Sequence, residues 1–368
     1  MVYSTRSLWE IVRNAVGDPQ AGSITFILDA LDECAEHEFQ NLVENVENQF
    51  RDNKSRPSKL KYLMTCRPYH QILSKFHRLL SVFPNVHIPG ENESEKISQE
   101  VNHVIKYRVK QLRMKDQFKN YLEETLQGIT HRTYLWVYLV FEYLESEVFK
   151  KTLKGLKSTI ETLPRTVNEA YERILNKAGD DQAVQRILHI ILAATRPLTL
   201  AEMSIALSID YNLKSLTDLD MEDDHDFRQS LRFQCGLFVS IYQGSIYLLH
   251  QTAREFLLAD LMPPTDIPSE LRWHRSITLR EAHATFSQIC VLFFNYHESD
   301  HKQMPLNIPN GSNGFFTYSA TYWAAHFYEA NFEKDAAIVP FALNVCKMGL
   351  WKRFGPRGVA RCCNSVIS

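Results

Sequence analysis

Residues 24–33 read ITFILDALDE, a short apolar run that ends in an acidic cluster. The run is rich in β-branched and aromatic residues, which predicts a parallel strand buried on both faces over residues 24–28. Carboxylates after such a strand suit nucleotide hydrolysis, because one can hold Mg²⁺ through water and another can orient the attacking water. The candidates are Asp29 for the metal and Asp32 and Glu33 for the water. The same acids are equally common as helix caps, so the segment alone leaves both interpretations open.

The sequence on either side of this segment has the pattern of a βαβ unit. Apolar spacing predicts helices over residues 8–16 and 38–50 and further strands over residues 60–65 and 85–88. In a parallel sheet the ligand lies beyond the carboxyl ends of the strands. Asp29 and Arg67 follow the ends of the first two strands, so both are candidates for contact with a bound ligand.

Downstream of the acidic stretch PGENESEK the pattern becomes helical. Helices are predicted over residues 95–112, 116–127, 133–148, 166–177, 182–194 and around 227–235. The Lys-rich stretch 150–157 is interpreted as a solvated helix end. Thr199, with Glu202 three positions on, predicts a capping box at the start of another helix.

The following segment has the pattern of a winged helix. Gln243-Gly244 predicts a turn between two strands, and TAREFLLADL over residues 252–261 predicts a helix after them. Helices followed by a hairpin are typical of this fold. Residues 266–368 read as helical again, and Trp273, Trp323 and Trp351 are expected to be packing anchors.

Composition and charge narrow the class of protein. The 368 residues are 45% hydrophobic and 11% aromatic, so several domains with sizeable cores are expected. The net charge of −2 provides no overall attraction to nucleic acid or to an anionic membrane. The N-terminus has no signal-peptide pattern and no apolar run is long enough to span a bilayer, so a cytoplasmic protein is expected. The 7 Cys residues have no zinc-site spacing and are expected to be free, buried thiols.

The segment ITFILDALDEC over residues 24–34 resembles the Walker B segment of NACHT-family NTPases, which belong to the STAND class. The likeness is strongest to fungal members and to the nephrocystin-3 N-terminal region. It continues in family order through LMTCRP (63–68), RTYLWVYLV (132–140), LPRTVNEAYERIL (163–175), RPLTLAEMSIALSI (196–209), GLFVSIYQGSIYLLHQTAREFLL (236–258) and YSATYWAAHF (318–327).

The resemblance implies a multidomain α/β plus α fold. Its parts would be a partial parallel-sheet P-loop NTPase half (1–90), a small helical lid (91–162), a winged helix (163–263) and a C-terminal helical connector (264–368).

The resemblance also implies roles for five residues toward Mg²⁺ and bound ATP, GTP or ADP. Asp29 would be the magnesium aspartate, and Asp32 and Glu33 would position water. Arg67 would sense the γ-phosphate, since a guanidinium forks well onto phosphate oxygens. His250 would touch the β-phosphate of ADP in a resting state. Taken alone, Arg67 is equally explained by an ion pair with an acid, and His250 by packing at a strand end.

A P-loop of the form G-x-x-x-x-G-K-[ST] does not occur in the chain. The near match over residues 17–23 has no Lys and stands between a helix and a strand, so it is interpreted as a turn. In the resembled family the P-loop would fall before Met1. Without its cradle Asp29 could not hold a Mg-nucleotide alone, so nucleotide binding is expected to be weak or absent. A sheet of two or three strands with an exposed edge would remain.

Three hypotheses for function follow. The first is a regulatory or scaffold fragment of a nucleotide-switched signalling NTPase, of the type linked to fungal innate immunity and self/non-self recognition. It would not hydrolyse nucleotide by itself, and its partners would be full-length NACHT relatives or a second copy. The alternative is an active ATP- or GTP-hydrolysing switch that is truncated at its N-terminus. The third is a winged-helix DNA binder that uses Arg228 and Arg232, against which stand the acids of residues 217–226.

Overall fold

The computed structural model describes residues 5–34, 36–52, 60–67, 74, 76, 77, 86, 94–129, 133–146, 152–177, 180–213, 215–219, 221–260, 271–301 and 312–347. The chain forms two compact units, residues 1–93 and 94–368. Each is described by itself. Most of the described residues are helical, and they include two small sheets.

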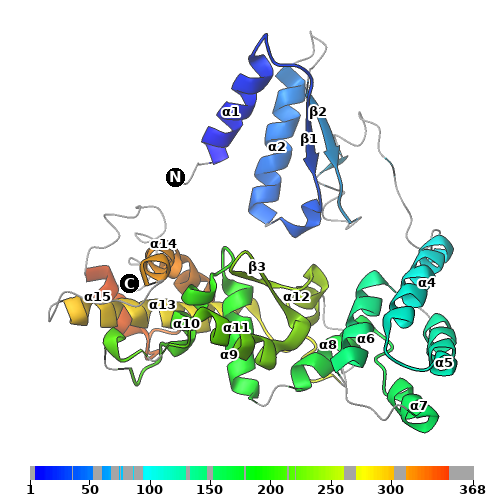
Figure 1. The fold of residues 1–368 in the computed structure, drawn as a ribbon. Coiled ribbons are helices and arrows are strands. Elements are labelled where there is room, and N and C mark those ends of the chain that lie inside the picture. The colour runs from blue at the N-terminus through cyan, green and yellow to red at the C-terminus, as the bar shows by residue number, and fades with distance from the viewer. Residues whose placement is uncertain are drawn as a thin grey trace. The chain divides into compact units, whose positions relative to one another are not determined.

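The first unit contains the predicted βαβ arrangement (Figure 1). Its elements are α1 (Thr5–Gly17), β1 (Ile24–Leu28), a 3₁₀ turn η1 (Leu31–Glu33), α2 (Glu36–Asp52) and β2 (Leu60–Met64). The strands β1 and β2 are parallel neighbours, with Ile24 opposite Leu60 and Leu28 opposite Met64. The prediction of a βαβ unit is therefore confirmed. Of the strand predicted over residues 85–88, all but Val86 lie outside the described residues.

The sheet of this unit is buried on one face only. Phe26 stacks on Tyr62 with ring centroids 5.5 Å apart, on the face that packs against a small core of Leu31, Phe39, Val43 and Phe76. On the opposite face Ile27 and Leu63 lie side by side and are 67% and 56% exposed. The prediction of a strand buried on both faces is wrong here. The described core of the unit covers one side of the sheet, and side chains alternate between the two sides.

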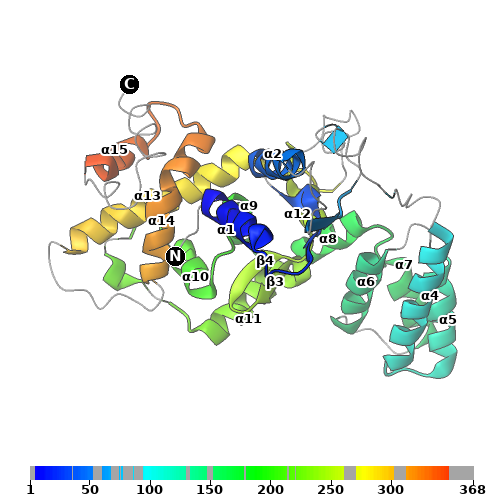
Figure 2. The ribbon, with the colours of Figure 1, turned by 90° about the horizontal axis from the view of Figure 1, so that it is seen from above.

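The second unit begins with a bundle of four helices (Figure 2). They are α4 (Ser94–Gln111), α5 (Asp116–Gln127), α6 (Tyr134–Ser146) and α7 (Leu153–Glu161). Of the last, only a solvated helix end over residues 150–157 was predicted, and the structure has a separate helix there. The Thr152 hydroxyl caps it by accepting from the Gly155 amide at 3.1 Å. The bundle encloses its own core, in which the Trp136 indole donates to the Pro164 carbonyl at 3.0 Å.

A winged helix follows the bundle. Its elements are α8 (Val167–Asn176), α9 (Asp181–Ala193), α10 (Leu200–Ser208), η2 (Leu216–Asp218), α11 (Asp224–Cys235), η3 (Gly236–Phe238), β3 (Val239–Tyr242), β4 (Ser245–Leu248) and α12 (Gln251–Leu257). The capping box of Thr199 and Glu202 is confirmed. The hairpin turn is confirmed too, with Gln243 and Gly244 at φ 49° and 77°, as a primed two-residue turn requires.

The helix predicted over residues 252–261 is shorter than expected. It ends at Leu257, and Leu258 is extended and forms a parallel bridge with Ile277. The Ala259 amide donates to the Ile277 carbonyl at 2.9 Å, and the Ile277 amide donates to the Leu257 carbonyl at 3.1 Å. This non-local pairing replaces the last helical turn.

The C-terminal helices share one core with the winged helix. They are α13 (Leu279–His301), α14 (Ser312–Ala330) and α15 (Val339–Lys347). The core runs from Leu139 of α6 to Val345 of α15 and is dense in Phe side chains. Trp273 and Trp323 are buried within it, which confirms them as packing anchors, whereas Trp351 lies outside the described residues. Across the described ranges, every helix is too short or too polar to cross a bilayer.

The cysteines only partly match the expectation of free, buried thiols. Cys235 and Cys290 are free and buried, and burial raises the pKa of each thiol to about 12. Cys34 and Cys66 are exposed thiols outside any disulfide, because they lie on the polar loops that follow η1 and β2. Cys346 is disulfide-bonded, so the expectation is wrong at that position.

Candidate nucleotide site

Asp29 stands directly after β1, where its side chain is exposed beyond the carboxyl end of the sheet. The hydroxyl of Thr65, the residue after β2, donates a hydrogen bond to Asp29 Oδ1. The same hydroxyl accepts from the Ala30 amide at 3.0 Å. Thr65 therefore fixes one carboxylate oxygen and leaves Oδ2 outside this bond. Carboxylate and hydroxyl oxygens are hard donors of the kind that Mg²⁺ binds, so the residue types fit the predicted ion.

A strained turn separates Asp29 from the other two acids. Ala30 has φ 54° and ψ 49°, the left-handed region that non-glycine residues rarely occupy. The residue that follows β2 stabilises this conformation, because the Leu31 amide donates to the Thr65 carbonyl at 3.0 Å. The turn reverses the chain into η1. Backbone strain of this kind costs about 1–3 kcal/mol and is concentrated at functional sites.

Asp32 and Arg67 form an ion pair. The Arg67 amide donates to Asp32 Oδ1 at 3.0 Å, and Arg67 Nε lies 3.4 Å from Asp32 Oδ2. The Asp32 side chain is 4% exposed and that of Arg67 is 35% exposed. Partial desolvation, and secondarily the negative charge of Asp32, raises the pKa of the neighbouring Cys66 thiol. The structure therefore joins two residues that the sequence assigned to different tasks, water positioning and phosphate sensing.

Glu33 ends η1, and its backbone lies within the same turn as Asp32. The segment before β1 is the turn that the sequence predicted in place of a P-loop. The Asp18 carboxylate accepts from the Gln20 amide at 2.8 Å, and the Asp18 carbonyl accepts from the Ala21 amide at 3.2 Å. An acidic side chain thus occupies a backbone donor that a phosphate cradle would need.

His250 belongs to the second unit, where it is the exposed N-cap of α12. Its Nδ1 accepts from the Thr252 amide at 3.2 Å and lies 3.0 Å from the Thr252 hydroxyl. That hydroxyl is 2.9 Å from the Tyr171 hydroxyl, which ties the cap to α8. Nδ1 therefore serves as the helix cap, and Nε2 points away from the capped amide. The predicted contact with a β-phosphate involves a residue that is both exposed and held in place.

The helix α11, considered for DNA binding, begins with acids. Asp223 caps it by accepting from the His225 and Asp226 amides at 2.8 and 2.9 Å. The exposed Asp224 and Asp226 follow in its first turn, ahead of Arg228. Carboxylates at this end of the helix repel the phosphates that a recognition helix must approach.

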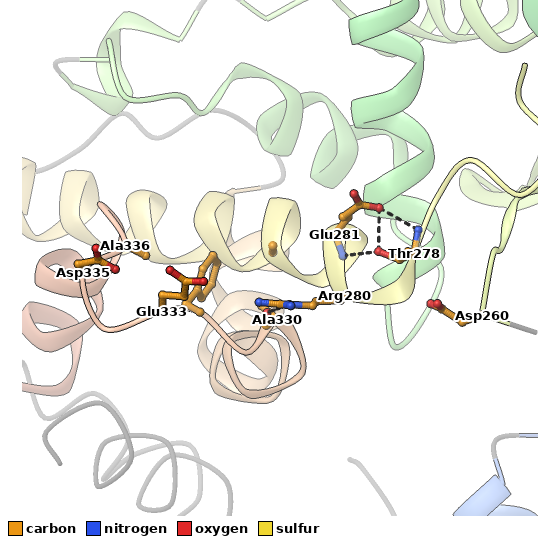
Figure 3. A pocket seen from close by; sticks show the side chains of 10 residues that line it. Asp260, Thr278, Arg280, Glu281, Ala330, Glu333, Asp335 and Ala336 are labelled. Carbon is orange, nitrogen blue, oxygen red and sulfur yellow. Dashed lines mark hydrogen bonds between the residues drawn. The ribbon is translucent and has the colours of Figure 1, made fainter.

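A cleft of about 590 Å³ lies in the second unit, between the start of α13 and the turn that joins α14 to α15 (Figure 3). Arg280 is at its centre, but its Nε and Nη2 donate to the carbonyls of Ala330 and Asn331 at 3.1 and 3.0 Å. Glu281 turns back to Thr278, accepting from its amide at 3.0 Å. None of the residues predicted to bind nucleotide lines this cleft.

Three families match parts of the chain. Residues 3–67 match the nephrocystin 3 N-terminal family, residues 97–163 match a domain of unknown function (DUF7069), and residues 171–271 match the winged helix domain of GPI inositol-deacylase. With the βαβ unit and the winged helix, these matches support a NACHT-like protein of the fungal type.

A fungal relative supports this assignment. The chain is 28% identical over 262 residues to the vegetative incompatibility protein HET-E-1 of Podospora anserina, a NACHT protein. The similarity covers 68% of this chain and 18% of that protein, so the chain spans only a small part of the relative's length. No solved structure is significantly similar.

Sequence reasoning missed Thr65. Its role depends on the parallel register of β1 and β2, which places a residue 36 positions away beside Asp29. A hydroxyl directly after the second strand of a βαβ unit was the signal that could have identified it, because parallel strands end at one edge of the sheet.

Proposed function

We propose that the chain is a regulatory or scaffold part of a nucleotide-switched signalling NTPase, of the fungal self/non-self recognition type, that does not hydrolyse nucleotide by itself. The observation that carries the proposal is the exposed Asp29 carboxylate, oriented by Thr65 at the end of β1. The matched nephrocystin 3 N-terminal family and the similarity to a vegetative incompatibility protein support this kind of signalling.

The ion pair of Asp32 and Arg67 supports the absence of hydrolysis. A carboxylate that positions water must direct an oxygen at it, and a guanidinium that senses phosphate must keep its donors available. Here an amide and a guanidinium nitrogen of Arg67 occupy the two Asp32 oxygens. In this arrangement the two charges compensate each other, which weakens both the water-positioning role of Asp32 and the phosphate-sensing role of Arg67.

Mg²⁺, when bound, would neutralise phosphate charge at this edge of the sheet. Asp29 Oδ2 is the oxygen that remains for it, directly or through water. The chain contains no Gly-rich loop with Lys to hold the β- and γ-phosphates. We therefore expect weak binding of ATP, GTP or ADP, and His250 would contribute only if its Nε2 meets the nucleotide.

The second candidate is an active NTPase in which a P-loop is supplied by further sequence or by another chain. The apolar pair of Ile27 and Leu63 supports a protein partner, since parallel sheets normally have both faces covered. The partner would be a full-length relative or a second copy. A P-loop encoded directly upstream in the same reading frame would favour this candidate.

The two candidates differ in nucleotide affinity and turnover. The experiment is calorimetric titration of the purified chain with ATP and GTP in the presence of Mg²⁺, together with an assay of phosphate release. We expect no turnover, and a residual affinity that falls in Asp29→Ala and Thr65→Val. The control variant Glu10→Ala, which removes an exposed carboxylate of the same unit, should leave the affinity unchanged. Micromolar affinity with turnover, lost in Asp29→Ala and His250→Ala, would establish the active alternative.

A further inference from the structure

A chain of hydrogen-bonded polar groups, buried at its centre, connects the winged helix to the C-terminal helices. It starts at Thr195, in the loop after α9, and continues through Tyr318 and His326 of α14 to His283 of α13. The Thr195 amide lies 3.0 Å from Tyr318 Oη, Tyr318 Oη lies 3.0 Å from His326 Nε2, and His326 Nδ1 lies 2.9 Å from His283 Nδ1. Tyr318 and His326 are 1% and 0% exposed. We refer to these four residues as the relay.

The chemistry of the groups limits how protons can be arranged in the relay. An amide can only donate, so the Tyr318 oxygen accepts from the Thr195 amide, and the Thr195 hydroxyl lies 3.3 Å from the same oxygen. The phenolic proton is given either to His326 Nε2 or to the Thr195 hydroxyl, and in the second case His326 Nε2–H donates to the Tyr318 oxygen. The contact between the two Nδ1 atoms holds one proton when both rings are neutral. In either arrangement one neutral ring therefore carries its proton on Nδ1 and the other on Nε2.

An added proton would turn one of the two rings into a cation. The Nδ1 atoms lie 2.9 Å apart and His326 is 0% exposed, so this charge would lie inside the protein. The new charge would also be enclosed by the Phe286 ring, whose centroid lies 4.9 Å from that of His326. Burying a charge without a partner is costly, so opening the junction becomes the cheaper response.

The surroundings of the two rings also favour their neutral forms. Burial, and secondarily His283, lowers the pKa of His326 to about 3. Burial also lowers the pKa of His283; Arg254 of α12 adds to that shift and Glu329 of α14 opposes it.

Two further buried groups face the relay region from neighbouring helices. From α9, burial lowers the pKa of His189, which Glu281 opposes, and its Nδ1 lies 2.8 Å from the Thr285 hydroxyl of α13. Cys290 of α13 is a neutral thiol whose pKa burial raises to about 12. Neither supplies a charge that would compensate a cation on the relay.

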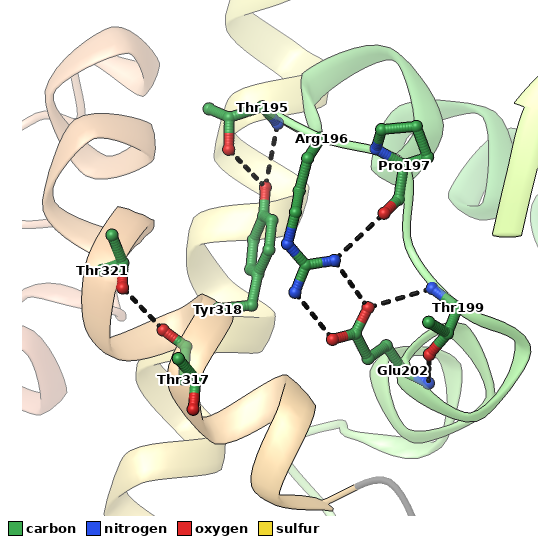
Figure 4. Close-up of polar contacts among 8 residues, drawn as sticks. All are labelled: Thr195, Arg196, Pro197, Thr199, Glu202, Thr317, Tyr318 and Thr321. Atoms are coloured by element: carbon green, nitrogen blue, oxygen red, sulfur yellow. Dashed lines mark hydrogen bonds and ion pairs between the residues drawn. The ribbon is translucent and has the colours of Figure 1, made fainter. Parts of the chain in front are cut away.

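The winged-helix end of the relay is fixed at a second point (Figure 4). The Arg196 guanidinium lies 5.0 Å from the centre of the Tyr318 ring and binds both oxygens of Glu202 at 2.7 and 2.8 Å. A Cβ on Gly314 of α14 would lie 2.9 Å from Glu202 Oε1, so the helix approaches this ion pair closely. Tyr318 is therefore held between the loop backbone and Arg196.

We propose that the relay of Thr195, Tyr318, His326 and His283 is an acid-sensitive lock between the winged helix and the C-terminal helices. Histidines of the open or unfolded chain take up protons below about pH 6.5, whereas the closed relay keeps both rings neutral. Because the folded pKa values are lowered, the stability that the relay provides is complete above that pH and is lost as the pH falls below it. The lock does not depend on bound nucleotide.

The first test is the thermal unfolding midpoint of the full chain at about pH 7.5 and about pH 5.5. We expect the midpoint of the wild type to fall on acidification. In the double variant His283→Gln and His326→Gln, which keeps hydrogen-bonding groups but cannot titrate there, the fall should be reduced by at least half. The control variant His225→Gln changes an exposed histidine of α11 and should fall like the wild type. An equal fall in the double variant overturns the proposal.

A second measurement on the wild type keeps the test decisive if the double variant does not fold. Nitrogen NMR of the two imidazoles should show neutral rings at about pH 6, with one ring protonated on Nδ1 and the other on Nε2. The Thr195 amide should be protected from hydrogen exchange at neutral pH. After correction for the intrinsic pH dependence, that protection should drop in acid. Cationic rings at about pH 6, or unchanged protection of Thr195 in acid, would each contradict the lock.

Discussion

The two compact units of the chain differ in how completely they bury their apolar side chains. In the first unit a small core covers one face of a two-stranded sheet, and Ile27 and Leu63 are exposed on the other. In the second unit one core extends without interruption from α6 to α15. The candidate nucleotide site is in the unit with the smaller core, and the relay is in the unit with the larger. The residues that could bind nucleotide therefore lie in the unit that buries its apolar side chains less completely.

The largest effect is expected from the core of the second unit. Phe293 is fully buried in α13 and stacks edge-on against Phe315 at 5.0 Å, so Phe293→Ala should destabilise the unit by about 3–5 kcal/mol through the cavity it leaves. Denaturant unfolding measures this loss of free energy, and hydrogen exchange of α13 reports it locally. Phe233→Ala at a 79% exposed position and Ile27→Ala should each change stability by less than about 0.5 kcal/mol. A large loss in Ile27→Ala would show that the sheet face is covered after all.

The next effect concerns a buried carboxylate that stabilises the second unit. Glu172 of α8 accepts from the amides of Arg272 and Trp273, each at 2.9 Å, and from the Asn176 side chain at 3.0 Å. Glu172→Ala should cost about 3 kcal/mol in the free energy of unfolding, because it leaves buried N–H groups without acceptors. Glu172→Gln keeps one carbonyl oxygen and should lose less. Chemical denaturation ranks the two variants, and equal losses would mean that packing outweighs these bonds.

A smaller loss is expected at the cap of α11. Gly236 has φ 55° and ψ −137°, and a Cβ there would lie 2.9 Å from Cγ2 of Ile174. Gly236→Ala should therefore destabilise the winged helix by about 2 kcal/mol, since side-chain-bearing residues avoid this backbone region. The matched control is Gly128→Ala, where φ is −78° and the nearest atoms are 3.5 Å away. If thermal melts gave both variants the same midpoint, backbone strain at position 236 would be refuted.

The smallest effect should have the opposite sign and belongs to the first unit. Ala30 is held in the left-handed region at the turn between Asp29 and Asp32, so Ala30→Gly should stabilise the unit by about 0.5 kcal/mol. The gain is small because glycine also loses more conformational freedom on folding. Ala15→Gly, on the exposed side of α1, should instead destabilise by about 1 kcal/mol. Hydrogen exchange of β1 and α1 peptides separates the two effects, and a loss in Ala30→Gly would mean that the turn carries no strain.

Local chemistry made much of the fold predictable. The apolar runs of the strands, the Thr199 and Glu202 spacing and the Gln243-Gly244 turn each act over a few residues, and all three are present. Features that depend on distant partners were not predictable. Asp32 meets Arg67 across 35 positions, and the relay joins Thr195 to Tyr318 across 123. The exposed face of β1 was missed for the same reason, since an apolar residue does not reveal whether a neighbour covers it.

The ion pair of Asp32 and Arg67 has a consequence for any anion that reaches the strand ends. A phosphate that recruits the Arg67 guanidinium competes with a carboxylate that is already bound to it and is 4% exposed. Its success would leave Asp32 with one backbone hydrogen bond and no countercharge, which is costly for a carboxylate so little exposed. Anion binding at Arg67 is thereby coupled to the loss of this ion pair, so the affinity for a phosphate is lowered by the free energy of breaking it.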